Sequence, residues 1–512
     1  MSAKVLQYDT HELETFLPHS QPTYINPVPT QIYYFGSSYE ANLKQYLLAA
    51  RTTRYGSVYK SHQKFIYIRP SPQVDVKVTV SENEKDLGQV KEDFDPFKAR
   101  HLDQPVSSGA TLTHLLKSSL GTGILSMPAA FKASGLWLGV ITTMLVSLIC
   151  THTAYALVTS AHALYRKAGK TSMSYAEVAE ESCLRGPPWA KKYAFLLKQL
   201  VLWAIFVTYY ATGSCYAVIV AENFNYVAFN YLGNFDKRIT IAMLFLPFLL
   251  IAYVPNLKYL APVSMVANFC MAIGLGITCY YLLNDIPSIS DRPAVTNLAT
   301  LPVCISIVIF AIEAIGVVMP LENNMKSPQK FVGLFGVLNQ GMTYVTILYI
   351  ILGFLGYLKY GDLTADSITL NLPREEYAAQ AVNLLIGLAV FFTYGLVFYV
   401  CLDIFWTEIK HRFTTKTALA NYALRTILVM INIIIAILVP AIVPFVGLIG
   451  AFCFSILGLV CPVIIEIFTF WDQGFGKFYW KLFKHLVVVC MALLAVVFGS
   501  KAAISDIAKT FH

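Results

Sequence analysis

Long apolar runs are the feature that most constrains what this chain can fold into. A helix needs about 20 mainly apolar residues to cross the hydrocarbon core of a bilayer. Eleven segments approach that length, in a chain of 512 residues that is 56% hydrophobic and only 13% charged. They cover about residues 108–133, 136–163, 193–222, 238–256, 259–284, 301–321, 331–358, 378–405, 420–440, 442–470 and 482–503. The sequence therefore predicts an all-α polytopic membrane protein with eleven transmembrane helices.

The first 105 residues have a different character. They are polar, rich in Tyr, Pro and Ser, and contain no run long enough to span a bilayer. Such a composition is typical of a disordered segment, and only YEANLKQYLLAARTTRY at 39–55 has the pattern of a short amphipathic helix. We expect residues 1–105 to form a mostly disordered cytoplasmic tail and residues 106–512 to form the transmembrane domain.

Basic residues indicate the orientation in the membrane, because Lys and Arg concentrate in cytoplasmic loops. Placing the N-terminus inside gives the cytoplasmic loops an excess of basic residues of roughly two to one. The net charge of +8 is then explained by these loops, and no nucleic acid partner is expected. We predict a cytoplasmic N-terminus and a C-terminus on the opposite side.

Two of the predicted spans contain helix-breaking residues in their middle. GTGILSMPAAF at 121–131 interrupts the first span, and AIEAIG at 311–316 interrupts the sixth. In lipid an unpaired backbone group costs several kcal/mol, so irregular backbone is tolerated only where protein or a water-filled cavity covers it. Interruptions at corresponding positions of two halves indicate a transporter built as an inverted repeat, with its site at the midplane. We predict a five-plus-five repeat with one extra helix.

The backbone of the first break suits an anionic group. Gly121 and Gly123 let the chain leave α geometry and let a ligand approach closely. A half-helix that starts near Ile124 would direct free N–H groups and the positive end of its dipole into the cavity. The carboxylate of an amino acid fits that environment. The alternative is that the glycines only allow two helices to pack closely, which explains Gly121 but not the Ser, Thr and Pro beside it.

Ionisable residues near the breaks are candidates for binding a coupling ion. His114, Lys117 and Gly121 share one helical face, and Glu313 lies within the second break. Because intramembrane ionisable groups mark ion pathways by default and histidine titrates nearest neutral pH, His114 is the first choice as proton carrier and His152 the second. Two alternatives stay open: Glu313 only neutralises Lys117, and His152 only bonds a neighbouring helix.

No catalytic signature is present. HELET at 11–15 lacks the second histidine of a zinc-protease helix, and the chain has neither a GxxxxGK[ST] phosphate loop nor a GxSxG elbow. We therefore expect no enzyme, no bound cofactor and no ATP-driven pump. An ion gradient would have to supply the energy for uphill transport, with the proton as the coupling ion.

Three motifs resemble the proton-coupled amino acid transporter family. They are HLLKSSLGTGILSMPAAFKASG (114–135), IFAIEAIGVVMPLENNMKSPQKF (309–331) and LGYLKYGDLTADSITLNLP (355–373). That family belongs to the amino acid/auxin permease branch of transporters with the leucine-transporter fold. The resemblance covers about residues 105–500. It implies symport of protons with small neutral amino acids such as glycine, alanine and proline, at the plasma membrane or the lysosomal membrane.

The resemblance also implies site residues. The histidine that such transporters use for proton coupling corresponds to His114. Where many relatives read HLLKGNIGTG, this chain has Ser118 and Ser119, a change that would alter the substrate range. The substrate-binding positions at the two breaks correspond to Gly121, Thr122, Gly123, Ile312, Glu313 and Gly316.

Two other functions remain open from the sequence. Sodium-coupled relatives hold Na⁺ among backbone carbonyls of the first and eighth helices, where this chain has Thr393 and Tyr394. A non-transporting sensor would bind an amino acid in the same cavity and signal to a cytoplasmic partner through the N-terminal tail.

Overall fold

The computed structural model describes residues 65–69, 77–81, 95–102, 105–233, 236–255, 257–312, 314–412, 417–474, 476 and 479–509. The chain divides into two compact units, Met1–Asp93 and Phe94–His512. Glu313 and the helix predicted at 39–55 lie outside the described residues. The predicted boundary near residue 105 stays a prediction.

The described residues of the first unit form a two-stranded antiparallel sheet. Strand β1 (Phe65–Arg69) pairs with β2 (Lys77–Ser81), with Phe65 opposite Ser81 and Arg69 opposite Lys77. Their sequences, FIYIR and KVTVS, are rich in the aromatic and β-branched residues that favour strands. The sequence prediction missed this hairpin, because it judged the tail by its average polarity, and the all-α assignment therefore does not extend to these residues.

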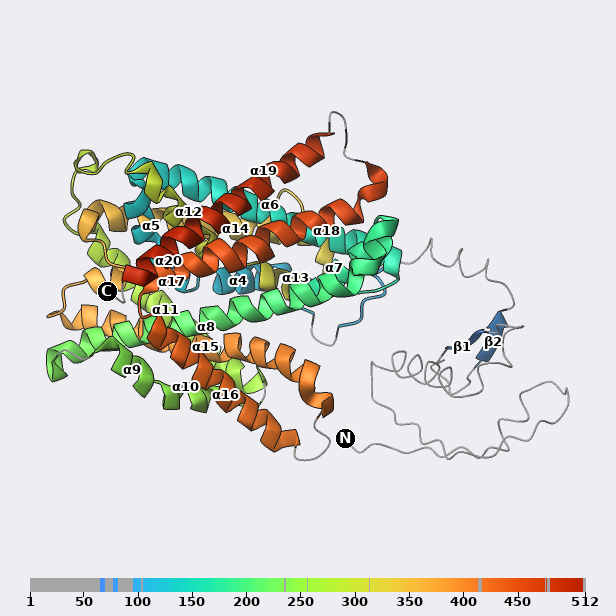
Figure 1. The fold of residues 1–512 in the computed structure, drawn as a ribbon, viewed down its shortest axis with the longest axis horizontal. Helices are drawn as coiled ribbons and strands as arrows, with labels where there is room; N and C mark the ends of the chain where they lie inside the picture. The colour runs from blue at the N-terminus through green and yellow to red at the C-terminus, as the bar shows by residue number, and fades with distance from the viewer. Residues whose placement is uncertain are drawn as a thin grey trace. The chain divides into compact units, whose positions relative to one another are not determined.

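The second unit is built of helices that run alongside one another (Figure 1). Each predicted span contains helical structure. The helices are α4 (Ser108–Ser119), α5 (Met127–Ser134), α6 (Leu136–Ala168), α7 (Tyr175–Arg185), α8 (Ala194–Leu232), α9 (Lys237–Met243), α10 (Phe245–Ala252), α11 (Leu257–Leu283), α12 (Leu301–Ile312), α13 (Ile315–Asn323), α14 (Val337–Tyr360), α15 (Tyr377–Ile409), α16 (Thr417–Leu438), α17 (Ile442–Leu448), α18 (Cys461–Thr469), α19 (Trp480–Leu494) and α20 (Ser500–Lys509). The π-helical segments η9 (Ile449–Val460) and η12 (Ala495–Gly499) join α17 to α18 and α19 to α20.

Nine helical stretches within the described residues are long and apolar enough to cross a membrane. Two of the predicted spans are not among them, because 108–133 consists of the shorter helices α4 and α5, and 238–256 consists of α9 and α10. The chain is therefore a polytopic helical membrane protein. The count of eleven helices and the inverted repeat stay predictions.

The outer surface of the bundle carries large apolar side chains. Leu148 of α6, Phe195 of α8 and Phe269 of α11 each have more than half of their surface exposed. So many large exposed apolar side chains are unusual on a protein that meets water on all sides. Inside the bundle, α15 packs along both α8 and α11. Apolar residues on the outside and close helix packing inside are what a bilayer requires.

The predicted interruption of the first span is present. Helix α4 ends at Ser119, and Gly121 has an extended backbone with φ −88° and ψ −156°. The chain then forms a 3₁₀ turn, η1 (Thr122–Ser126), before α5 begins at Met127. An α-helix starting near Ile124, as predicted, would place Pro128 where its ring clashes with the carbonyl one turn earlier. In α5 the proline instead occupies the first turn, where its missing N–H costs nothing.

The sixth span is interrupted as well. Helix α12 ends at Ile312, and Ala314, with φ −117° and ψ 11°, precedes α13. Both η1 and α5 pack against α12. The two interrupted spans therefore meet inside the bundle, although their residues are nearly 200 positions apart in the sequence.

Candidate functional site

The two breaks touch at Gly123. A Cβ atom built on Gly123 would lie 2.5 Å from Ala311 Cα and 2.8 Å from Ala311 Cβ. Only glycine lets the main chain of η1 approach α12 this closely. Close packing of two helices, the alternative raised for these glycines, is therefore the physical reason for glycine at position 123.

Gly121 has a different environment. The nearest atoms to a Cβ built there would be Tyr216 Oη at 3.9 Å and Ser118 O at 4.0 Å. The Tyr216 hydroxyl, from α8, lies near Thr122, which is itself buried. The space beside Gly121 is therefore bordered by polar groups and is open to a small one.

Tyr349 of α14 joins the two breaks. Its buried hydroxyl hydrogen-bonds Ser119 O, at the end of α4, and lies 2.9 Å from Ala311 O, near the end of α12. A phenol has a single hydrogen, so it donates to only one of these carbonyls at a time. The breaks therefore present two main-chain oxygens to one donor. The sequence reasoning missed Tyr349, although a tyrosine buried in an apolar helix needs a hydrogen-bond partner and could have been noted on that ground.

Ser119 adds a buried hydroxyl without a hydrogen-bond partner to the same region. Its side chain is 4% exposed, and its Oγ has no hydrogen-bond partner among the described residues. A buried hydroxyl without a partner is costly unless a ligand or water satisfies it. Of the other predicted substrate-binding residues, Ile312 is fully buried in α12, and Gly316 lies so close to Tyr209 of α8 that a Cβ would overlap the tyrosine hydroxyl.

His114 lies on the exposed side of α4. The next residue, Leu115, is buried on the opposite side of the helix and packs against Gly341 of α14. Within the described part of the chain, His114 makes no hydrogen bond or ion pair. Lys117 is half-buried on the same helix. Its pairing with Glu313 lies outside the described residues and stays a prediction.

His152 belongs to another cluster. Its charged neighbours are Glu466 of α18 and Lys484 and His485 of α19, rather than residues of the broken helices. Glu466 accepts hydrogen bonds from Lys484 Nζ and His485 Nε2, both at 2.9 Å. His152 Nε2 is buried and has no hydrogen-bond partner within the described ranges. The structure therefore does not bring His152 together with His114.

A buried carboxylate that the sequence reasoning missed lies at the end of α13. Glu322 is fully buried and accepts hydrogen bonds from Arg100, which precedes α4, and from His162 and Tyr165 of α6. These bonds measure 3.2 Å to Arg100 Nη2, 2.9 Å to His162 Nε2 and 2.9 Å to the Tyr165 hydroxyl. Main-chain bonds from Val106 N to Asn324 O (2.9 Å) and from Lys326 N to Val106 O (2.8 Å) add to this attachment. The segment leading into α4 is thereby fastened to the end of α13.

The residues proposed for sodium binding have mixed environments. Thr393 Oγ1 donates to Ala389 O of its own helix at 2.8 Å. Tyr394 is fully buried, and its hydroxyl has no hydrogen-bond partner among the described residues. Neither observation favours a cation there over simple packing within α15.

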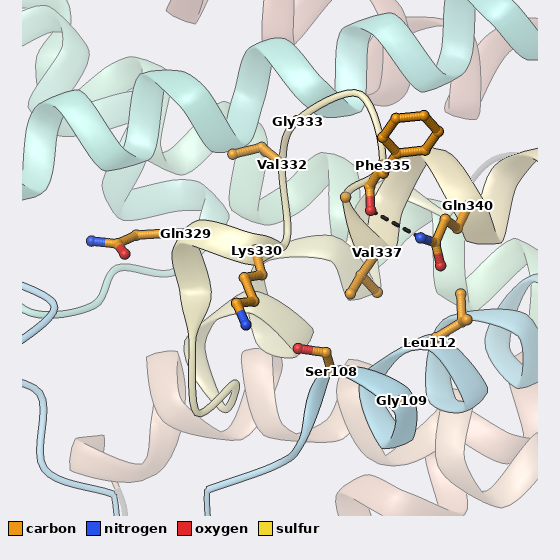
Figure 2. Close-up of a pocket in the computed structure, with 11 residues that line it drawn as sticks. Ser108, Gly109, Leu112, Gln329, Lys330, Val332, Gly333, Phe335, Val337 and Gln340 are labelled. Atoms are coloured by element: carbon orange, nitrogen blue, oxygen red, sulfur yellow. Dashed lines mark hydrogen bonds between the residues drawn. The ribbon is translucent and has the colours of Figure 1, made fainter.

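A pocket of about 430 Å³ opens beside the first turns of α4 and α14 (Figure 2). Ser108, Gly109 and Leu112 of α4 form one wall, and the loop with Gln329, Lys330 and Phe335 forms another. Gln340 Nε2 donates to Phe335 O at 2.9 Å across its rim. The pocket is lined by none of the predicted site residues, so we place the candidate site at the helix breaks instead.

Comparison with known sequences gives consistent matches over most of the chain. The family described as "Transmembrane amino acid transporter protein" matches residues 104–505. The "Proton-coupled amino acid transporter-like protein pathetic" of Drosophila melanogaster is 49% identical over 457 residues, which are 89% of this chain and 97% of that protein. The "Probable amino acid transporter skat-1" of Caenorhabditis elegans is 25% identical over 430 residues, 81% of this chain and 92% of that protein.

Two solved structures match over most of the chain at low sequence identity. Mhp1, a nucleobase-cation-symport-1 family transporter in a closed conformation, has a TM-score of 0.48 and 13% sequence identity, over 80% of this chain and 94% of that one. MhsT in complex with L-phenylalanine has a TM-score of 0.40 and 13% identity, over 80% of this chain and 99% of that one.

Proposed function

Because this chain belongs to the transmembrane amino acid transporter family, we propose that it is a symporter that moves small neutral amino acids together with protons by alternating access. The substrates are of the glycine, alanine and proline class. The protein resides in the plasma membrane or the lysosomal membrane, with its N-terminus in the cytoplasm. The name of the Drosophila melanogaster relative supports the proton as the coupling ion.

The observation that carries this proposal is that a carbonyl from each of the two breaks lies within hydrogen-bonding distance of the same tyrosine hydroxyl. Tyr349 donates to one of two nearby carbonyls, Ser119 O and Ala311 O, and leaves the other to accept from a second donor. The ammonium group of an amino acid is such a donor. Its carboxylate faces the main-chain amides that begin η1, beside the open space at Gly121.

The proposed site also limits the size of the substrate. Ile312 and Thr122 are buried beside it, and Tyr209 lies against Gly316. A larger side chain on the amino acid would have to displace these groups, which is why we propose small neutral substrates.

Proton coupling is assigned to His114, with Glu313 as a second group. His114 is exposed and has no bond to other described residues, so a proton can reach its imidazole. A charge gained at His114 changes the electrostatics of α4, the half-helix that ends at the first break.

Uptake into proteoliposomes tests the proposed function. With the full-length protein, labelled alanine should accumulate when the outer solution is more acidic than the lumen and sodium is absent, and the uptake should carry inward current. Uptake that requires sodium and ignores the pH gradient would identify a sodium-coupled transporter. Binding of alanine without any flux would identify a sensor, and both results would refute the proposal.

A further inference from the structure

A buried carboxylate lies about ten residues before the end of α8. Glu222 has a side chain that is 5% exposed, and its Oε1 is paired with Lys237 Nζ, from the first turn of α9. The Lys237 side chain is 39% exposed, so this partner reaches the carboxylate from solvent. The second carboxylate oxygen, Glu222 Oε2, is buried and has no hydrogen-bond partner among the described residues. One of the two oxygens of this buried carboxylate therefore lacks a hydrogen-bond donor.

A second carboxylate interacts with Glu222. Asp366 lies in the loop between η6 (Gly361–Leu363) and η7 (Ile368–Asn371) and contributes a negative charge near Glu222. Asp366 Oδ2 accepts a hydrogen bond of 3.2 Å from Val443 N, at the start of α17. Two neighbouring carboxylates repel each other when both are charged, unless solvent or further donors reach them. Glu222 is the better buried of the two and has one oxygen without a partner among the described residues, so we take it as the group that binds a proton.

Other charged groups on elements packed against α8 include Arg238 of α9 and Arg374, whose guanidinium lies 5.3 Å from the Tyr226 ring. Helix α17 contains no titratable side chain, and Arg425 of α16 is bonded to main-chain carbonyls at the end of α10. The acidic residues of α15, Asp403 and Glu408, lie in its last two turns. Cys215 is on α8 itself and interacts with Glu222. Among the described residues, Lys237 and Asp366 are the charged groups that act directly on Glu222.

The loop that carries Asp366 also reaches the first break. Thr369 Oγ1 donates a hydrogen bond of 3.1 Å to Oδ1 of Asn223, the residue that follows Glu222 in the sequence. Asn383 Nδ2 donates to Thr369 O, also at 3.1 Å. The same loop buries Ile368 completely, and η7 packs against η1. One segment thus contacts both the neighbour of Glu222 and the proposed substrate site.

We propose that Glu222 is a proton-binding residue of the transport cycle, loaded from the side opposite the cytoplasm and coupled to the substrate site through the loop 361–373. This inference rests on the proposed function and deepens it. A proton from the outer solution binds Glu222 Oε2, forming one O–H bond, while Lys237 keeps its own proton and turns to solvent. Neutral Glu222 no longer repels Asp366, so the loop stays against α8 and closes over the loaded amino acid.

The variant Glu222→Gln tests this role, because glutamine keeps the shape of the side chain but cannot take up a proton. In full-length protein reconstituted in liposomes, accumulation of alanine driven by an outer acidic pH should fall by about 5- to 150-fold, the usual range for coupling between two sites. Exchange of labelled for unlabelled alanine at equal pH on both sides should stay near the wild-type rate. Glu180→Gln is the matched control, since Glu180 also pairs with a lysine, Lys198, at 2.7 Å.

Substitutions of the two charged neighbours keep the test decisive if Glu222→Gln fails to fold. Lys237→Met removes the counter-charge and should move the midpoint of the outer pH dependence of uptake to higher pH. Asp366→Asn removes the repulsion and should move it to lower pH. If the wild-type protein shows proton-driven uptake and both variants keep its midpoint, the proposed role of Glu222 is overturned. A wild type without proton-driven uptake would instead refute the proposed function.

Discussion

Gly123→Val should abolish amino acid uptake by separating the two breaks, whereas Gly121→Ala should keep the fold and only weaken the apparent affinity for alanine. A Cβ at position 123 would meet Ala311 Cα at 2.5 Å, and main chain cannot yield as a flexible side chain does. Overpacking a well-packed interior costs about 1–3 kcal/mol or more, and here the strain separates η1 from α12. At Gly121 the nearest atom is 3.9 Å away, so a methyl group fits without displacing any neighbour.

The measurement for this pair is the initial rate of alanine uptake per correctly inserted molecule. Size-exclusion profiles of the detergent-extracted variants show whether each one folds. Wild-type uptake by Gly123→Val would contradict the close contact of the two breaks. Loss of uptake in both variants to the same extent would contradict the difference in space between the two glycines.

His114→Ala should remove the dependence of uptake on the pH gradient. The substitution deletes the one imidazole on α4, and His114 makes no bond with the other described residues that its loss would break. We therefore expect the protein to insert and to exchange labelled for unlabelled alanine, because exchange needs no net proton movement. Accumulation against a gradient should disappear.

His411→Ala provides the comparison for this second variant. His411 is an exposed histidine in the short turn after α15 and lies far along the chain from the first break. It should behave like the wild type in both assays. A His114→Ala protein with full pH dependence would remove His114 from the coupling mechanism and leave Glu222 and Glu313 as the remaining carboxylate candidates.

The helix runs and both breaks could be predicted from sequence because their causes are local. Apolar length defines a span, and the glycines at 121 and 123 and the proline at 128 act on the backbone next to them. The resemblance drawn from three motifs is confirmed, since the family match covers residues 104–505. The 3₁₀ start of the second half-helix was not predicted, although Pro128 supplied the reason for it.

The long-range pairs could not be predicted, because no local pattern specifies them. Arg100 and Glu322 are 222 residues apart, and Tyr349 meets Ser119 O from 230 residues away. Even Glu222 and Lys237, only 15 residues apart, pair because the chain turns between α8 and α9. For the same reason, the sequence could not show that His152, the second choice as proton carrier, lies near Glu466 and His485.

The central claim is that an amino acid lies against the exposed main chain of the first break, and alkylation of Gly121→Cys tests it most directly. The rate at which a small thiol reagent modifies the new side chain is followed by mass spectrometry, with and without saturating alanine. We predict that alanine slows this reaction and leaves the reaction of Phe335→Cys, on the exposed loop of the pocket in Figure 2, unchanged. Equal rates at Gly121→Cys with and without alanine, in protein that still takes up alanine, would contradict the account.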